Sequence, residues 1–83
     1  MKCKYIGELY DGHNGQYVLI FTLDSIYNAE KAEINLRYQL RARFGFSIEV
    51  SRDMDKVNVR YGCADDKYKI RNFVAQYIEM LND

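Results

Sequence analysis

The alternation of hydrophobic and polar residues is clearest around Gln16–Asp24, the longest apolar run of the chain. Most of its side chains are branched or aromatic, and no charge interrupts it before Asp24. Such a run between turn-forming residues is typical of a strand with both faces at least partly covered, which predicts a central position in a sheet. Because alternate side chains of a strand point to opposite faces, one face should carry Tyr17, Leu19, Phe21 and Leu23, and the other Val18, Ile20 and Thr22.

Three further segments alternate with a period of two and are predicted to be strands. In residues 3–10, the core face should carry Cys3, Tyr5, Gly7 and Leu9, and the open face Lys4, Ile6, Glu8 and Tyr10. Gly7 indicates a weak point or a bulge in this strand. The other two predicted strands are residues 46–51 and 56–61. Their inward-facing side chains should be Phe46, Ile48, Val50, Val57, Val59 and Tyr61. Turn-forming residues at 11–15 and 52–55 predict two hairpin connections.

Two segments show helical spacing. The first, Tyr27–Phe44, has a core stripe of Ala29, Ala32, Leu36, Leu40 and Phe44. Asp24, Ser25 or Asn28 can cap its start. Gly45 suits its end, with Phe46 expected to pack back on it. The second helix should be capped by Asp65 or Asp66, and its apolar face comprises Ile70, Phe73, Val74, Tyr77, Ile78 and Leu81.

The predicted order of elements is β-β-α-β-β-α, which indicates one α+β domain over residues 1–83. This is the cyclic order of the ferredoxin-like βαββαβ unit with its last strand moved to the front. We therefore predict a four-stranded antiparallel sheet in the order 1-2-4-3, with both helices on one face. A plain 1-2-3-4 meander is the alternative.

Composition narrows the possible partners. The chain has 12 basic and 12 acidic residues, so no overall field attracts it to nucleic acid or to a membrane surface. We find neither the roughly 18 consecutive apolar residues of a spanning helix nor a secretion signal, which predicts no membrane partner and a cytoplasmic location. Cys3 and Cys63 stand apart from any CxxC pair or Cys/His cluster, so we expect reduced thiols.

No motif with the spacing of a catalytic, cofactor or metal site occurs, so we predict a non-enzyme with no cofactor and no metal. The alternative is a site near the first hairpin turn, either a metal site or a Cys–His nucleophile pair. It would use Asp11, His13, Cys63, Asp65 and Asp66. The simpler interpretation is a solvated turn histidine with two capping aspartates.

Nucleic-acid binding is the second hypothesis, and it rests on cations of the two helices. The candidates are Lys31, Arg37, Arg41 and Arg43 in the first helix, and Lys67, Lys69 and Arg71 in the second. An RNA-binding sheet would place stacking aromatic side chains at the centre of its open face. The predicted open face carries aliphatic and polar residues there, which weakens this hypothesis.

The chain is rich in tyrosine, with eight tyrosines, four phenylalanines and no tryptophan. We place Tyr5, Tyr17, Tyr61 and Tyr77 in the core. The remaining aromatic and apolar candidates do not fit it. On the first helix, Ile34, Tyr38 and Arg41 lie opposite the core stripe. The open sheet face carries Tyr10, Val18 and Ile20. Tyr68 lies on the outer side of the second helix.

Tyrosine and arginine are enriched at the centres of protein interfaces. We therefore predict a non-catalytic protein-binding module that acts by stoichiometric binding, as an inhibitor or adaptor. A phage-type inhibitor of a host enzyme or defence complex is an example of this class. A homodimer through the open sheet face is also possible, since Val18 and Ile20 would otherwise be uncovered.

Overall fold

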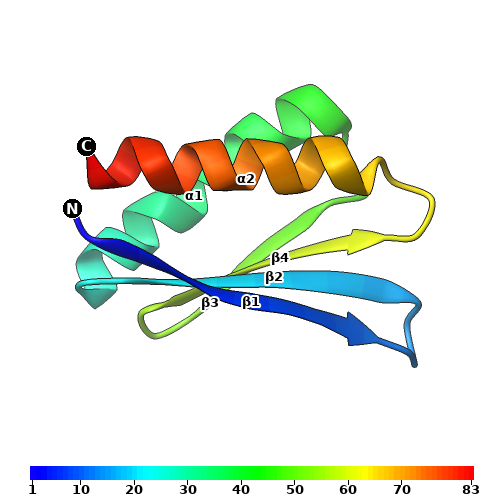
Figure 1. Cartoon of the computed structure of the whole chain (residues 1–83), viewed down its shortest axis with the longest axis horizontal. Coiled ribbons are helices and arrows are strands. Elements are labelled where there is room, and N and C mark those ends of the chain that lie inside the picture. The colour runs from blue at the N-terminus through cyan, green and yellow to red at the C-terminus, as the bar shows by residue number, and fades with distance from the viewer.

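The computed structural model describes all 83 residues and contains a four-stranded antiparallel sheet with two helices on one of its faces (Figure 1). The elements are β1 (Cys3–Asp11), β2 (Gln16–Leu23), α1 (Ile26–Phe44), β3 (Glu49–Asp53), β4 (Lys56–Gly62) and α2 (Lys67–Asn82). The strand order is β1-β2-β4-β3. The predicted α+β fold and its 1-2-4-3 order are confirmed, and the meander is wrong.

The apolar run of the sequence forms a central strand. β2 pairs with β1 on one side and with β4 on the other. Leu19, Phe21 and Leu23 are buried on the helix-covered face, as predicted. One hydrophobic cluster joins them to the buried residues of β4, α1 and α2. The core therefore lies between the sheet and the two helices.

The first helix begins and ends as its sequence indicates. The Ser25 hydroxyl accepts a hydrogen bond from the Asn28 backbone N–H at 3.0 Å, which caps the first turn. At the other end, the Gly45 backbone N–H donates to the Arg41 carbonyl oxygen at 3.0 Å. Gly45 has a φ of 87°, a conformation that disfavours any residue with a Cβ atom.

Replacing Gly45 with alanine should lower the free energy of unfolding by about 1 kcal/mol, because alanine is strained at this φ. The matched control is Gly12→Ala. A Cβ atom at Gly12 would meet its nearest neighbour at an ordinary 3.8 Å, and Gly12 has no positive φ. Urea denaturation of both variants measures the difference. Equal losses at the two glycines would contradict the role assigned to Gly45.

The first strand contains a bulge, and this corrects part of the prediction. Tyr5 is opposite Phe21 and Gly7 is opposite Ile20, so Ile6 is an extra residue between them. After the bulge the side chains exchange faces. Glu8 and Tyr10 lie on the helix side, opposite Leu19 and Tyr17, whereas Leu9 lies on the open face opposite Val18. The predicted faces of Glu8, Leu9 and Tyr10 are therefore wrong.

The third strand starts later than predicted, which moves Phe46 out of the core. Residues 46 and 47 form a turn, and β3 begins at Glu49. Ile48 and Val50 are buried as expected, but Phe46 is 82% exposed. Its predicted place in the core is wrong because the turn after Gly45 directs it outward, although its ring still lies beside Arg41 at the end of α1. Tyr5, also predicted in the core, is half exposed.

The two chain ends lie side by side at one end of the molecule (Figure 1). The Asn82 side chain joins them, because its Nδ2 donates to the Cys3 carbonyl oxygen at 2.8 Å and its Oδ1 accepts from the Cys3 N–H at 2.6 Å. The last turn of α2 is thereby fixed to the start of β1.

Candidate functional site

The outer side of α1 carries an exposed apolar surface with an arginine at its centre. Ile34, Tyr38 and Phe46 are 60%, 76% and 82% exposed. Together with Arg41 they line a groove of about 450 Å³, completed by Arg37 and Ala42. We call Ile34, Tyr38, Arg41 and Phe46 the α1 surface. The sequence-based candidates Ile34, Tyr38 and Arg41 are thus brought together in one place.

Helical geometry explains why these side chains adjoin. Residues three or four positions apart lie on the same side of a helix, and Ile34, Tyr38 and Arg41 have this spacing. The buried residues Ala32, Leu36 and Leu40 occupy the opposite side. The turn at Gly45 then places Phe46 beside the last helical turn, where the Arg41 guanidinium carbon lies 5.6 Å from the centre of the Phe46 ring.

The two arginines of the groove differ in their freedom. Arg37 is held in place, because its Nη2 lies 2.7 Å from a Glu33 oxygen and 2.8 Å from the Val50 carbonyl oxygen. Arg41 makes no ion pair and its one aromatic contact is Phe46. The α1 surface therefore offers an unneutralised charge in a groove lined mostly by apolar side chains.

Sequence reasoning missed Phe46 as a member of this surface. The alternation of residues 46–51 counted it as a core residue. The available signal was Gly45, because a left-handed residue at the end of a helix reverses the chain and breaks the register of the strand that follows.

The open sheet face is less accessible than predicted at its centre. Val18 is only 7% exposed, although no helix covers it. Arg60 lies opposite Val18, and its Nη1 forms an ion pair at 3.1 Å with Asp11, which lies opposite Gln16 on β1. This pair crosses β2 on the open face and covers Val18. The expectation that Val18 is uncovered is therefore wrong, while Ile20 is half-buried and Ile6 and Leu9 are exposed.

Tyr10 and Tyr68 belong to neither surface. Tyr10 lies on the helix side of the sheet, with its ring centre 5.0 Å from that of Tyr17, which in turn stacks on Tyr61 at 5.4 Å. Tyr68 is exposed at the start of α2, where the Lys67 ammonium lies 5.5 Å from its ring centre. The prediction that Tyr10 lies on the open face is wrong because of the β1 bulge.

A polar network joins β1, β4 and α2. The Glu8 carboxylate accepts hydrogen bonds from the Tyr61 hydroxyl and from Arg71, whose Nε lies 2.8 Å from Oε2. The Arg71 hydrogen bond, aided by the one from Tyr61, holds the pKa of Glu8 below its usual range of about 4.5. Burial, with the adjacent carboxylate, raises the pKa of Tyr61. The network is an internal ion pair that fastens α2 to the sheet.

The residues considered for a metal site or a Cys–His nucleophile pair make local structural hydrogen bonds instead. Asp11 accepts from the His13 N–H and from Asn14, and it also binds Arg60. Asp65 accepts from the Ser47 hydroxyl and the Gly62 N–H, and Asp66 caps α2. The Cys63 thiol donates to the Gly15 carbonyl oxygen at 3.3 Å. No group of three or more His, Cys, Asp or Glu side chains is arranged to hold a metal ion.

The candidate nucleic-acid cations are dispersed. Arg37 and Arg71 are held in ion pairs with Glu33 and Glu8. The Lys31 ammonium lies over the Tyr27 ring near the start of α1. The cations come together only in twos: Arg43 and Lys69 in a groove between the helices, Arg37 and Arg41 in the α1 groove, and Lys67 and Arg71 beside the Tyr17 ring. Two neighbouring cations are fewer than the roughly six to ten phosphate contacts that give a protein strong affinity for a duplex.

Comparisons of the chain with protein-family models, curated proteins and solved structures found no match. Neither helix is both long enough and apolar enough to cross a membrane.

Proposed function

We propose that this chain is a non-catalytic protein-binding module that acts by stoichiometric occupation of a partner's surface, as an inhibitor or adaptor. One observation carries the proposal: Ile34, Tyr38 and Phe46, all largely exposed, line one groove with the unpaired Arg41, on α1 and the turn that follows it. A folded protein gains nothing in its own stability from these exposed rings, whereas burial against a partner removes their apolar area from water.

The composition of the α1 surface matches the centre of a protein interface. Aromatic residues and arginine contribute most to such centres, since they bury large areas with few rotatable bonds. Helix α1 is fastened to the core by four fully or almost fully buried side chains, so the surface is already ordered before binding. This preorganisation lowers the entropic cost of association. The unpaired Arg41 favours a partner that presents a carboxylate among apolar side chains.

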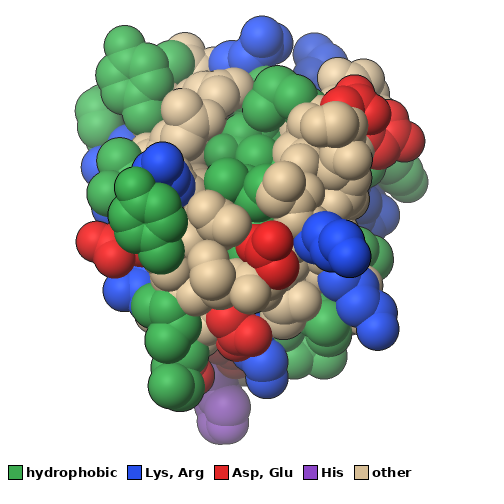
Figure 2. All heavy atoms as spheres, turned by 90° about the vertical axis from the view of Figure 1, so that its left-hand side faces the viewer, with side chains coloured by type: hydrophobic (Ala, Val, Ile, Leu, Met, Phe, Trp, Pro, Cys, Tyr) green, Lys and Arg blue, Asp and Glu red, His purple; other side chains and the backbone are tan.

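The α1 surface is more favourable than the open sheet face. There the Arg60–Asp11 pair covers Val18 and places two charges on the centre of the sheet. A partner or a second copy on this face would have to accommodate or remove that ion pair, with a desolvation cost. Figure 2, which views the molecule from the side of the chain ends, shows hydrophobic side chains protruding along one edge, with basic and acidic side chains between them.

The test is photo-crosslinking from a benzophenone amino acid placed at Tyr38, in cells of the native host. A second bait carries the same group at Met54, which is exposed on the β3–β4 turn. We expect one protein to be captured from position 38 and not from position 54. Irradiation of a lysate already treated with nuclease should give the same capture.

The purified partner should then bind with one-to-one stoichiometry in calorimetry. Tyr38→Ala and Phe46→Ala should each weaken binding by at least 1 kcal/mol, about fivefold. Tyr68→Ala, which removes an equally exposed tyrosine from α2, is the matched control and should change the affinity by less than about twofold. Loss of capture with nuclease, or equal effects of Tyr38→Ala and Tyr68→Ala, would refute the proposal.

A further inference from the structure

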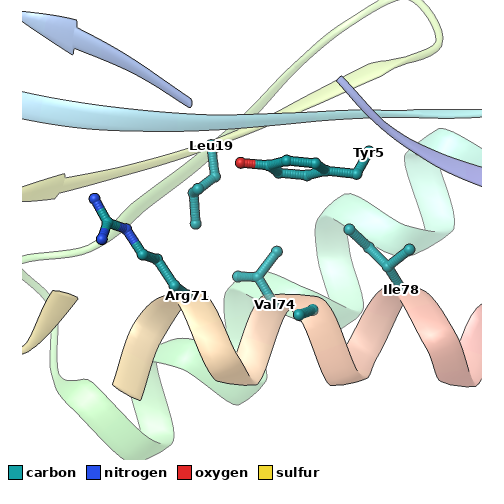
Figure 3. A pocket seen from close by; sticks show the side chains of 6 residues that line it. Tyr5, Leu19, Arg71, Val74 and Ile78 are labelled. Carbon is teal, nitrogen blue, oxygen red and sulfur yellow. The ribbon is translucent and has the colours of Figure 1, made fainter. Parts of the chain in front are cut away.

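A cavity lies between the first two strands and α2, on the side of the core away from the α1 surface. It has a volume of about 350 Å³ and is lined by Tyr5, Leu19, Arg71, Val74, Ala75 and Ile78. Figure 3 shows Arg71 at one end and Ile78 at the other, with Leu19 and Tyr5 on the sheet side. Its walls are apolar except at the Arg71 end.

The size of the cavity suits a small organic molecule. Binding pockets for such ligands span roughly 300 to 1,000 Å³. An apolar protein cavity of roughly 150 Å³ holds one benzene molecule. The present cavity has about twice that volume, which corresponds to a molecule with two fused rings. The buried side chains of Leu19, Val74 and Ile78 provide the contacts that such rings need.

The polar end of the cavity is electrically neutral. Arg71 directs Nε and Nη2 to the Glu8 carboxylate, which balances its charge. An anionic ligand would therefore meet a neutralised guanidinium beside a carboxylate, and would lose its hydration without gaining an ion pair. The arrangement favours an uncharged ligand.

One hydrogen-bond donor at the cavity belongs to a half-exposed residue, Tyr5, and is free to bind a ligand. The Tyr5 hydroxyl makes no hydrogen bond within the protein, whereas the nearby Tyr61 hydroxyl donates to Glu8 and accepts from Arg71. Figure 3 shows the Tyr5 ring lying along the sheet side of the cavity, with its hydroxyl directed towards the end where Leu19 and Arg71 lie. A ligand oxygen at this position would satisfy the donor.

We propose that this cavity is a binding site for a neutral, predominantly apolar molecule of about two-ring size that carries one hydrogen-bond acceptor, held by the Tyr5 hydroxyl. The site is independent of the α1 surface, because the two share no residue and lie on different helices. Tyr5 sets the orientation of the ligand, and Leu19, Val74 and Ile78 supply the apolar contacts.

The experiment is an NMR titration of the full chain with 2-acetylnaphthalene, which is neutral and has one ketone oxygen. Naphthalene is the probe without an acceptor, and 2-naphthoate is the anionic probe. We expect 2-acetylnaphthalene to shift the amide signals of Tyr5, Val74 and Ile78 in a saturable manner. It should bind more tightly than naphthalene and much more tightly than 2-naphthoate.

Two variants assign the site. Tyr5→Phe keeps the ring but removes the hydroxyl, and should weaken 2-acetylnaphthalene about fivefold while leaving naphthalene unchanged. Ala75→Leu fills the cavity from the exposed side of α2 and should weaken both neutral probes about tenfold or more. Because leucine is a good helix former, this variant should fold. Its fold is checked by its amide spectrum.

Ala42→Leu is the matched control, since Ala42 is an exposed alanine that lines the α1 groove instead. It should leave all three probes unaffected. The proposal is overturned if 2-acetylnaphthalene does not bind, if its shifts map to the α1 surface, if Ala75→Leu has no effect, or if 2-naphthoate binds equally well.

Discussion

Replacing Leu36 with alanine should lower the free energy of unfolding by about 3 to 4 kcal/mol. Leu36 is fully buried at the middle of the α1 stripe, in the cluster that joins both helices to the sheet. Truncation removes apolar contacts and leaves a cavity that the helix cannot fill without moving. In a domain of 83 residues, this loss is a large part of the total stability. Urea denaturation followed by circular dichroism measures it.

The matched control is Ile34→Ala, two positions earlier on the same helix. Ile34 belongs to the exposed α1 surface. Its truncation should change the free energy of unfolding by less than about 0.5 kcal/mol. If the two variants lose similar stability, the orientation of α1 described above is incorrect.

Replacing Glu8 with glutamine should lower the free energy of unfolding by about 1 to 2 kcal/mol at pH 7. Glu8 is the shared acceptor for Arg71 and for the Tyr61 hydroxyl, both of which lie at the edge of the core. Glutamine has nearly the same shape, but it lacks the charge and one of its two terminal atoms is a donor. The control is Glu79→Gln on α2, because Glu79 is exposed and makes no hydrogen bond. It should have little effect.

The pH dependence of this difference has a definite sign. Because the pKa of Glu8 is lower in the folded chain than its ordinary value of about 4.5, the folded state binds the proton less readily than the unfolded state. The stability contributed by Glu8 is therefore fully present above pH 4.5 and is lost as the pH falls through the folded pKa.

The difference in stability between the natural chain and Glu8→Gln should accordingly shrink as the pH falls below 4.5. The pKa values of Asp11 and Asp24 are also lowered, by hydrogen bonds led by Asn14 and Asn28 respectively. Both aspartates are present in both proteins, so their titrations cancel in the difference. A difference that stays constant across this range would show that the Glu8 carboxylate does not stabilise the fold through its charge.

The sequence predicted the fold correctly where the spacing of hydrophobic residues continues without interruption through a helix or strand. The alternation in β2 placed Leu19, Phe21 and Leu23 in the core, and the helical spacing placed Ala32, Leu36 and Leu40 there. The errors occur where one residue changes the register. Ile6 is inserted in β1, and the turn at Phe46 delays β3. Beyond such a residue, an alternating pattern assigns each side chain to the opposite face.

Only part of the α1 surface was predicted, because only part of it lies on one element with regular spacing. Ile34, Tyr38 and Arg41 lie on one uninterrupted helix, so their common side follows from spacing alone. Phe46 joins them through a turn, and the Arg60–Asp11 pair covers Val18 through contacts between β4 and β1, residues 49 positions apart. Neither arrangement follows from local spacing. The cavity beside Tyr5 likewise depends on how far α2 stands from β1.

By itself, the sequence determined which segments are helices and strands, the central position of β2 and the side of α1 that is left exposed. Hydrophobic periodicity acts within a single element, and the burial of apolar area enforces it. The tertiary structure alone decided that Glu8 pairs with Arg71, that Phe46 completes the α1 surface and that a cavity opens beside Tyr5. These features depend on distances between elements far apart in the chain, which side-chain packing and the β1 bulge set together.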